Sequence, residues 1–209
     1  MDNKPNKPKY QIDFFMDLIC EWCYLGYYVL NTLSDKYDFS INYRLMEIHP
    51  DAPKQGMPMS YHLHFPERFY KQLDTLGAPY GLRFNHKDIF ANTHDALLIS
   101  QCALDKGKGS NLLHYLWDEY MLKGINISNR EFLEDAALKF GISPRDAELA
   151  FSDLKTQASL AYNLHMNEQG PAQGQVPAFI VNGSYFMIGA QSADTWEELF
   201  AKLATESGQ

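Results

Sequence analysis

Cysteine is scarce in this sequence, with three among 209 residues. Small secreted proteins that depend on disulfides contain cysteine in larger, even numbers, so this count excludes a structural disulfide framework and is typical of a reducing compartment. Two of the three are separated by two residues, in the run Cys20-Glu21-Trp22-Cys23. We therefore predict a cytoplasmic protein in which these two cysteines have a chemical role.

Positive charge and long apolar runs are also in short supply. Lys and Arg number 18 against 26 Asp and Glu, for a formal net charge of -8. A phosphate backbone would repel such a chain, so we expect no nucleic-acid partner. No stretch approaches the roughly 20 apolar residues of a membrane span, and residues 1–9 lack the apolar centre of a signal peptide. We expect no membrane partner and a disordered tail over residues 1–9.

Apolar material for a core is plentiful, at 45% hydrophobic and 14% aromatic residues. This composition and length favour a folded chain that is either one ample domain or a small domain carrying a large insertion. The patterns near both ends are mixed. Strand periodicity at 10–17 and 39–48 flanks a helical pattern from 20 to 36, and a hairpin about Asn182-Gly183 precedes a helix at 196–204.

The middle of the chain lacks a convincing strand period. Helical patterns are expected there at 66–76, 92–106, 111–123 and 129–140, with two more helices within 144–165. We therefore assign residues 10–60 and 151–209 to an α/β domain with a mixed central sheet. Residues 61–150 are assigned to an all-α helical insertion domain.

The Cys20–Cys23 spacing at the start of a predicted helix suits thiol-disulfide exchange. Cys20 would attack as a thiolate, because unpaired N–H groups and the helix dipole stabilise an anion there, and Cys23 would resolve the mixed disulfide. The carboxylate of Glu21 should disfavour a second negative charge, which predicts a more reducing couple. Two further residues are expected to tune the site. Trp22 is expected as an exposed edge that excludes water or, less favoured, as a side chain that only packs on the insertion domain. Asp17 is expected as a helix cap or, less favoured, as a proton acceptor for Cys23.

A lone pair of cysteines at this spacing can also be half of a zinc site. The remaining ligands would then come from His49, His62, His64 or Cys102. No second such cysteine pair exists, and His62 and His64 lack the usual spacer between histidine ligands. We favour the catalytic pair and expect no metal. Cys102 lies in an apolar helical pattern and is expected to pack in the core.

Five segments, in this order, carry a family resemblance: Asp17-x-x-Cys20-x-Trp22-Cys23-Tyr-Leu-Gly26, His49-Pro50, Asn92-Thr93-His94-Asp-Ala96, Val176-Pro177-Ala-Phe179 and Gly189-Ala-Gln191. The chain resembles the DsbA-like oxidoreductases of the FrnE branch. That resemblance implies an α/β thioredoxin fold interrupted by a helical insertion. It also implies that Val176 and Pro177 form a substrate-binding cis-proline loop beside the redox pair. The sequence departs from the family at Glu21, where proline is common, and at His49, where asparagine is usual.

The resemblance implies a thiol-disulfide oxidoreductase, a reductase or isomerase of protein disulfides. Its partners would be protein or small-molecule disulfides and thiols, with no bound cofactor, and glutathione can serve as reductant because backbone groups around a cis-proline can pair with an extended peptide. Two alternatives stay open. One is a glutathione-dependent isomerase or transferase, as in the related 2-hydroxychromene-2-carboxylate isomerases and kappa-class glutathione transferases, which carry serine at the first active-site position. The other is a non-redox zinc- or peptide-binding protein.

Overall fold

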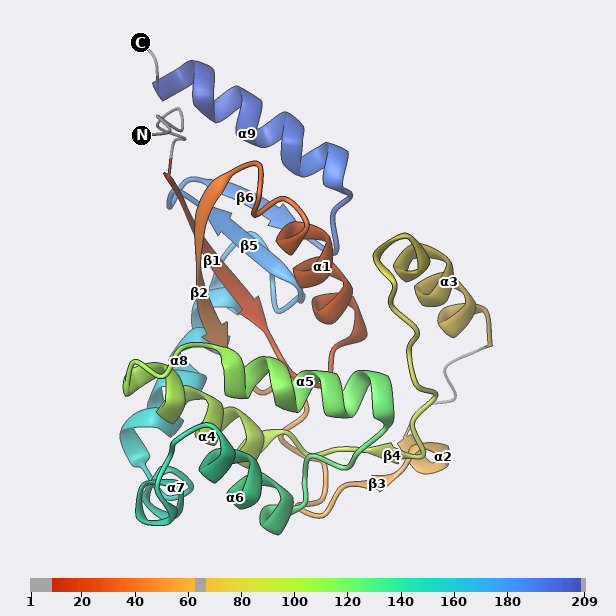
Figure 1. The fold of residues 1–209 in the computed structure, drawn as a ribbon, viewed down its shortest axis with the longest axis vertical. Coiled ribbons are helices and arrows are strands. Elements are labelled where there is room, and N and C mark those ends of the chain that lie inside the picture. The colour runs from red at the N-terminus through yellow and green to blue at the C-terminus, as the bar shows by residue number, and fades with distance from the viewer. Residues whose placement is uncertain (1–8, 63–66, 208–209) are drawn as a thin grey trace, which may run out of the picture.

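A four-stranded mixed sheet forms the centre of the computed structural model, which describes residues 9–62 and 67–207. The strand order is β2-β1-β5-β6, with β1 parallel to β2 and all other pairs antiparallel. The strands are β1 (Lys9–Met16), β2 (Asp38–Leu45), β5 (Ala178–Val181) and β6 (Tyr185–Ile188). This is the mixed sheet that the sequence predicted, with the hairpin β5–β6 at one edge (Figure 1).

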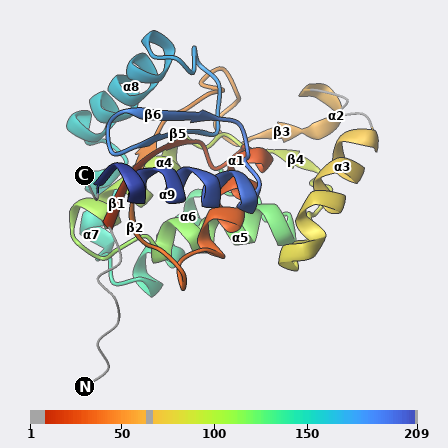
Figure 2. The same cartoon turned by 90° about the horizontal axis from the view of Figure 1, so that it is seen from above.

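Helices cover both faces of this sheet because β1 is apolar on both. One face of β1 buries four side chains: Tyr10, Ile12, Phe14 and Met16. On the other face Phe15 is 6% exposed and packs with Met46 and Ala178. Figure 2 shows α1 (Glu21–Asn31) and α9 (Ala193–Ser207) on one side of the sheet and α8 (Leu154–Gln169) on the other.

A largely helical segment separates β2 from β5, as the sequence predicted. Its helices are α2 (Met59–His62), α3 (Glu67–Gly77), the short 3-10 helix η1 (Ala78–Tyr80), α4 (His94–Asp105), α5 (Asn111–Lys123), α6 (Arg130–Lys139) and α7 (Pro144–Ala150), followed by α8, which returns the chain to the sheet. The sequence analysis missed a small antiparallel ladder in which β3 (Met57–Pro58) pairs with β4 (Ile89–Phe90). Two-residue strands are too short for alternation to be visible. The assigned domain boundaries remain a prediction.

The helical segment and the sheet share one continuous core. Trp117 of α5 is fully buried, and its ring lies 5.3 Å from that of Tyr24 and 6.3 Å from that of Phe14. Phe14 in turn stacks on Phe179 of β5 at 4.5 Å. The helix that carries the cysteine pair is therefore held between the sheet and the helical segment.

Several expected boundaries shift. Helix α1 was expected to continue to about residue 36 but ends at Asn31. At this end the Thr32 hydroxyl donates to Val29 O, and turns follow. Helix α9 begins earlier than expected, because Ser192 Oγ accepts the Thr195 N–H. The predicted disordered tail lies outside the described residues, except that its last residue, Lys9, opens β1. Of the helices in the described part of the chain, none combines the length and apolar character needed to span a membrane.

Candidate active site

Cys20 is the N-cap residue of α1. Its backbone is extended, with φ −84° and ψ 109°, and its Sγ accepts a hydrogen bond from the Cys23 N–H at 3.1 Å. A sulphur atom in this position faces the unpaired N–H groups and the positive end of the helix dipole, which stabilise a thiolate. The side chain is partly exposed. Cys20 thus combines access to solvent with an anion-stabilising setting.

Cys23 lies one turn into α1 and is fully buried. Burial, and then the neighbouring Cys20 sulphur, raise the pKa of the Cys23 thiol well above its ordinary value. The negative charge of Asp17 acts in the same direction. The two thiols, both free in the structure, therefore differ in access and in ease of ionisation, as an attacking and a resolving thiol must.

Asp17 lies beneath the cysteine pair with no solvent exposure. Its carboxylate accepts the N–H groups of Ile19, at 3.3 Å, and Ile48, at 2.9 Å. Burial is the main cause that raises the pKa of Asp17 to about 6, while these bonds and one from the Thr93 hydroxyl oppose it. The prediction that Asp17 caps the helix is wrong, since the cap is the sulphur of Cys20. Asp17 instead joins the start of the site to loops from two other parts of the chain.

The loop before β5 lies against the cysteine pair. The Val176–Pro177 peptide bond is cis, and Val176 O lies 4.0 Å from Cys20 Sγ. Val176 is partly exposed and Pro177 is buried. The Pro177 carbonyl accepts the N–H of Gly189, which ties the loop to the end of β6. The structure thus brings together the two parts of the site that the sequence placed far apart.

The two residues between the cysteines point into the helical segment. Trp22 is partly buried rather than the exposed edge that was favoured, and its ring meets that of Phe69 of α3 edge-on at 6.1 Å. Glu21 is buried, with 6% of the residue exposed, and its carboxylate accepts a hydrogen bond from Lys87 Nζ at 2.8 Å. Sequence reasoning missed Lys87, because it stands in an irregular segment between η1 and β4 and belongs to no motif. Only the folded chain brings this lysine to the cysteine pair.

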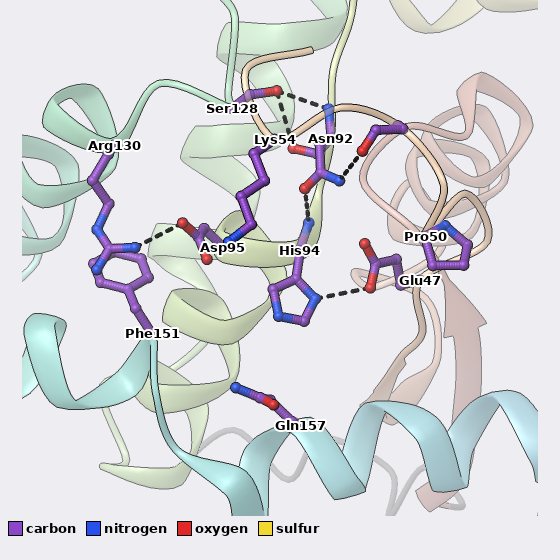
Figure 3. A pocket seen from close by; sticks show the side chains of 11 residues that line it. Glu47, Pro50, Lys54, Asn92, His94, Asp95, Ser128, Arg130, Phe151 and Gln157 are labelled. Atoms are coloured by element: carbon purple, nitrogen blue, oxygen red, sulfur yellow. Dashed lines mark hydrogen bonds and ion pairs between the residues drawn. The ribbon is translucent and has the colours of Figure 1, made fainter.

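A polar cavity of about 500 Å³ lies next to the residues that hold Asp17 (Figure 3). Its lining comes from the loop after β2, from the N-terminus of α4, and from α6 and α8. His94 Nδ1 lies 2.8 Å from Glu47 Oε2, and Arg130 Nη1 lies 2.7 Å from Asp95 Oδ2. The Asn92 side chain links two parts of the lining: its Nδ2 donates to Ala52 O, and its Oδ1 accepts the His94 N–H. A hydrogen bond between His94 and Glu47 and an ion pair between Arg130 and Asp95 thus hold these four side chains within the wall.

The other residues considered as zinc ligands lie in the following surroundings. The ring of His49 lies 5.1 Å from that of Phe90. His114, a histidine that belongs to no motif, forms a 2.7 Å hydrogen bond with the Tyr43 hydroxyl. Cys102 is partly exposed, so the expected core packing is only partial, and burial raises the pKa of its thiol. His64 and the side chain of His62 fall outside what the structure describes. In the part of the chain it does describe, no group of three or more His, Cys, Asp and Glu side chains could hold a metal ion.

Solved structures share this fold over nearly the whole chain. A probable DsbA oxidoreductase from Streptomyces coelicolor superposes with a TM-score of 0.82 at 19% identity, over 94% of this chain and 91% of that one. A 2-hydroxychromene-2-carboxylate isomerase gives 0.72 at 13% identity, over 95% and 98%. The cytosolic disulfide reductase DsbM from Pseudomonas aeruginosa, in its structure with glutathione, gives 0.65 at 16% identity, over 95% and 100%.

A search of curated protein sequences found no match. The model of the DSBA-like thioredoxin domain family, however, matches residues 11–201. That range contains the whole sheet, the cysteine pair, the Val176–Pro177 loop and the helical segment. The architecture is a thioredoxin fold interrupted by helices. The chain belongs to the DsbA-like thioredoxin domain family.

Proposed function

We propose that this protein is a cytoplasmic thiol-disulfide oxidoreductase that works through Cys20 and Cys23. The observation that carries the proposal is the asymmetry of the pair at the start of α1. Cys20 Sγ is partly exposed and accepts a helix N–H, whereas Cys23 is buried beneath it. An accessible, stabilised thiolate above a sheltered second thiol is the requirement for exchange followed by resolution. Membership of an oxidoreductase family supports the same activity.

The proposed reaction has two exchange steps. The Cys20 thiolate attacks one sulphur of a substrate disulfide, the substrate S–S bond breaks, and the other substrate sulphur leaves as a thiolate and takes up a proton. The Cys23 thiolate then attacks Cys20 Sγ in the mixed disulfide, and the first substrate sulphur leaves. The substrate gains two electrons, and the protein is left with a Cys20–Cys23 disulfide. Two equivalents of a thiol such as glutathione return it to the dithiol.

The second step needs a proton acceptor for the buried Cys23. Asp17 is suited to this, because its pKa of about 6 leaves it mainly ionised at neutral pH while keeping it more basic than an ordinary carboxylate. The charge of Asp17 already influences the Cys23 thiol, so the two groups are close enough to interact. We assign Asp17 the transfer of the Cys23 proton, directly or through one water molecule.

Substrates would approach along the Val176–Pro177 loop. The Val176 carbonyl faces Cys20 Sγ, and an extended peptide with a cysteine at that sulphur can donate a backbone N–H to it. Glutathione is such a peptide. The glutathione-bound structure of the disulfide reductase DsbM, which has the same fold, supports glutathione as the reductant here. Protein disulfides and small disulfides would share this approach.

The test is reduction of insulin disulfides by glutathione, catalysed by the wild type and by three serine variants. Cys20→Ser should fall to the uncatalysed rate, because it lacks the attacking thiol. Cys23→Ser should accumulate a mixed disulfide that intact-protein mass spectrometry detects. Cys102→Ser is the matched control and should retain wild-type activity. Turnover that survives Cys20→Ser would overturn the proposal and favour a glutathione-dependent isomerase or transferase.

A further inference from the structure

The Glu21 side chain lies beside the cysteine pair and is buried against residues of the helical segment. Its side chain is 8% exposed, and its charge contributes to raising the pKa values of two tyrosines, Tyr70 and Tyr120, for which burial is the main cause. Both phenols come from the helical segment, on α3 and α5. Glu21 is therefore not a carboxylate in open solvent beside Cys20. Its surroundings have a low capacity to screen charge.

Lys87 is the buried partner of the Glu21 carboxylate. Its side chain is 0% exposed, and its Nζ lies 2.8 Å from Glu21 Oε1, 3.5 Å from Met121 Sδ and 4.7 Å from the centre of the Tyr120 ring. A lysine ammonium that is fully out of water needs a counter-charge, because the cost of burying it alone is very large. Glu21 is the carboxylate that meets it in the structure.

The backbone around Lys87 is fixed on both sides. Asn85 N–H donates to Met121 O at 2.8 Å, and Asp88 O accepts the Met59 N–H at 2.8 Å. The first bond ties the segment to the end of α5, and the second ties it to the start of α2. The ammonium is thus delivered to Glu21 by a segment anchored on two helices, rather than by a free surface loop.

We propose that Lys87 is a positioning residue that sets the reduction potential of the Cys20–Cys23 couple by cancelling the charge of Glu21. This rests on the proposed function. A lone Glu21 carboxylate would disfavour the Cys20 thiolate and make the couple more reducing, which is what the sequence alone indicates. The paired ammonium supplies an equal and opposite charge, so the Glu21–Lys87 pair carries no net charge. The stability of the Cys20 thiolate is then set by the N-terminus of α1. The helical segment would in this way tune a redox pair carried by the sheet domain.

A charge cycle tests this with three variants, all measured as the full chain against glutathione. Glu21→Gln leaves the ammonium and should shift the equilibrium with glutathione toward the dithiol by about tenfold, which is ~30 mV more oxidising for a two-electron couple. Lys87→Met leaves the carboxylate and should shift it by about tenfold the other way. Glu21→Gln with Lys87→Met should return to within about threefold of the wild type.

A variant that lost structure would not give shifts of the reduction potential that are opposite in the two single variants and cancel in the double variant. Lys123→Met, which removes an exposed lysine of α5 paired with Glu119, is the matched control and should leave the potential unchanged. If Lys87→Met does not fold, Glu21→Gln and the double variant still isolate the lysine charge. Shifts in the same direction, or equal potentials in those two variants, would overturn the inference.

A second readout separates this inference from the proposed function. In a background with Cys23→Ser and Cys102→Ser, the rate of Cys20 alkylation by iodoacetamide at neutral pH reports the thiolate without any redox step. Lys87→Met should slow it and Glu21→Gln should not. A wild type with no titratable couple would overturn the proposed function and this inference together. A normal couple with unmoved alkylation and potential would overturn this inference alone.

Discussion

At the scale of single residues, the site depends on a carboxyl group that the fold keeps out of water. Asp17 holds two loop N–H groups, from Ile19 and Ile48, and its charge acts on the buried Cys23. A surface aspartate would be fully ionised and a poor base at neutral pH. Burial raises its pKa to about 6, which makes it a better acceptor for the Cys23 proton.

Asp17→Asn should therefore slow the resolving step. We expect release of the substrate thiol from the Cys20 mixed disulfide to fall about 10- to 100-fold, within the range for loss of a general base. Rapid quenching in acid followed by mass spectrometry measures it. Asp13→Asn is the matched control, since Asp13 lies on β1, the strand that Asp17 directly follows, and is paired with Arg44 at the surface of the sheet. Equal resolution rates in the two variants would show that Asp17 takes no proton.

The residues that sequence could and could not identify differ in a physical way. The roles of Cys20 and Cys23 were predictable because their spacing at a helix start fixes them locally, whereas the place of Pro177 beside them was implied only by the family resemblance. Lys87 was not, because its partner is 66 residues away in sequence and no period or motif marks the segment that carries it. The cap position was misjudged because a cysteine sulphur can accept the N–H that Asp17 was expected to accept.

At the scale of elements, the β3–β4 ladder depends on a tight approach at Gly56. This glycine has φ +77°, and a Cβ there would lie 2.9 Å from both Ile89 Cγ2 and Phe90 O. Gly81 has a similar φ of +73°, but among the described residues, its chain neighbours apart, no atom lies within 4 Å of such a Cβ. The two positions carry the same backbone constraint and differ in crowding. The ladder links the loop after β2 to the segment that delivers Lys87.

Gly56→Ala should consequently destabilise the protein more than Gly81→Ala. The left-handed backbone should cost about 1 kcal/mol at both sites, and the contact with strand backbone should add about 1–3 kcal/mol at Gly56 alone. Urea denaturation of both variants measures the difference in the free energy of unfolding. A Gly56→Ala variant no less stable than Gly81→Ala would mean that the ladder yields without cost.

Element prediction succeeded where a period is long enough to register. Helix α5 was predicted with its observed bounds, Asn111–Lys123, because it spans several turns and ends at Gly124 in the left-handed conformation. The β5–β6 hairpin was predicted from Asn182-Gly183, and both residues have positive φ. The two-residue strands β3 and β4 have no such signal, and their pairing depends on tertiary packing.

At the scale of the whole molecule, the partly buried His114 and the buried Asp17 give the free energy of unfolding opposite dependences on pH. Burial lowers the pKa of His114 to about 4, so its contribution to stability is present above the unfolded value of 6.5 and is lost as pH falls toward 4. Burial raises the pKa of Asp17 from 3.8 to about 6. Its contribution is present below 3.8 and is lost as pH rises toward 6. The two slopes partly offset each other in the wild type.

The His114→Gln variant should show the pH dependence of the free energy of unfolding that Asp17 produces alone. Relative to this variant, the wild type should lose about 3 kcal/mol of unfolding free energy between pH 6.5 and 4, since the native state excludes a proton that the unfolded chain binds. Denaturant titrations at a series of pH values measure both proteins. If the free energy of unfolding changed with pH in the same way in both proteins, a neutral, partly buried His114 in the native state would be contradicted.

The account as a whole depends on one property of the molecule, a reversible disulfide between Cys20 and Cys23. The most direct measurement is equilibration of the protein with defined ratios of reduced and oxidised glutathione, followed by acid quenching, alkylation and thiol counting by mass. We predict a single two-electron transition in which these two thiols are lost together, with Cys102 unaffected and no transition in Cys20→Ser. A wild type that keeps all its thiols at every ratio would contradict the account.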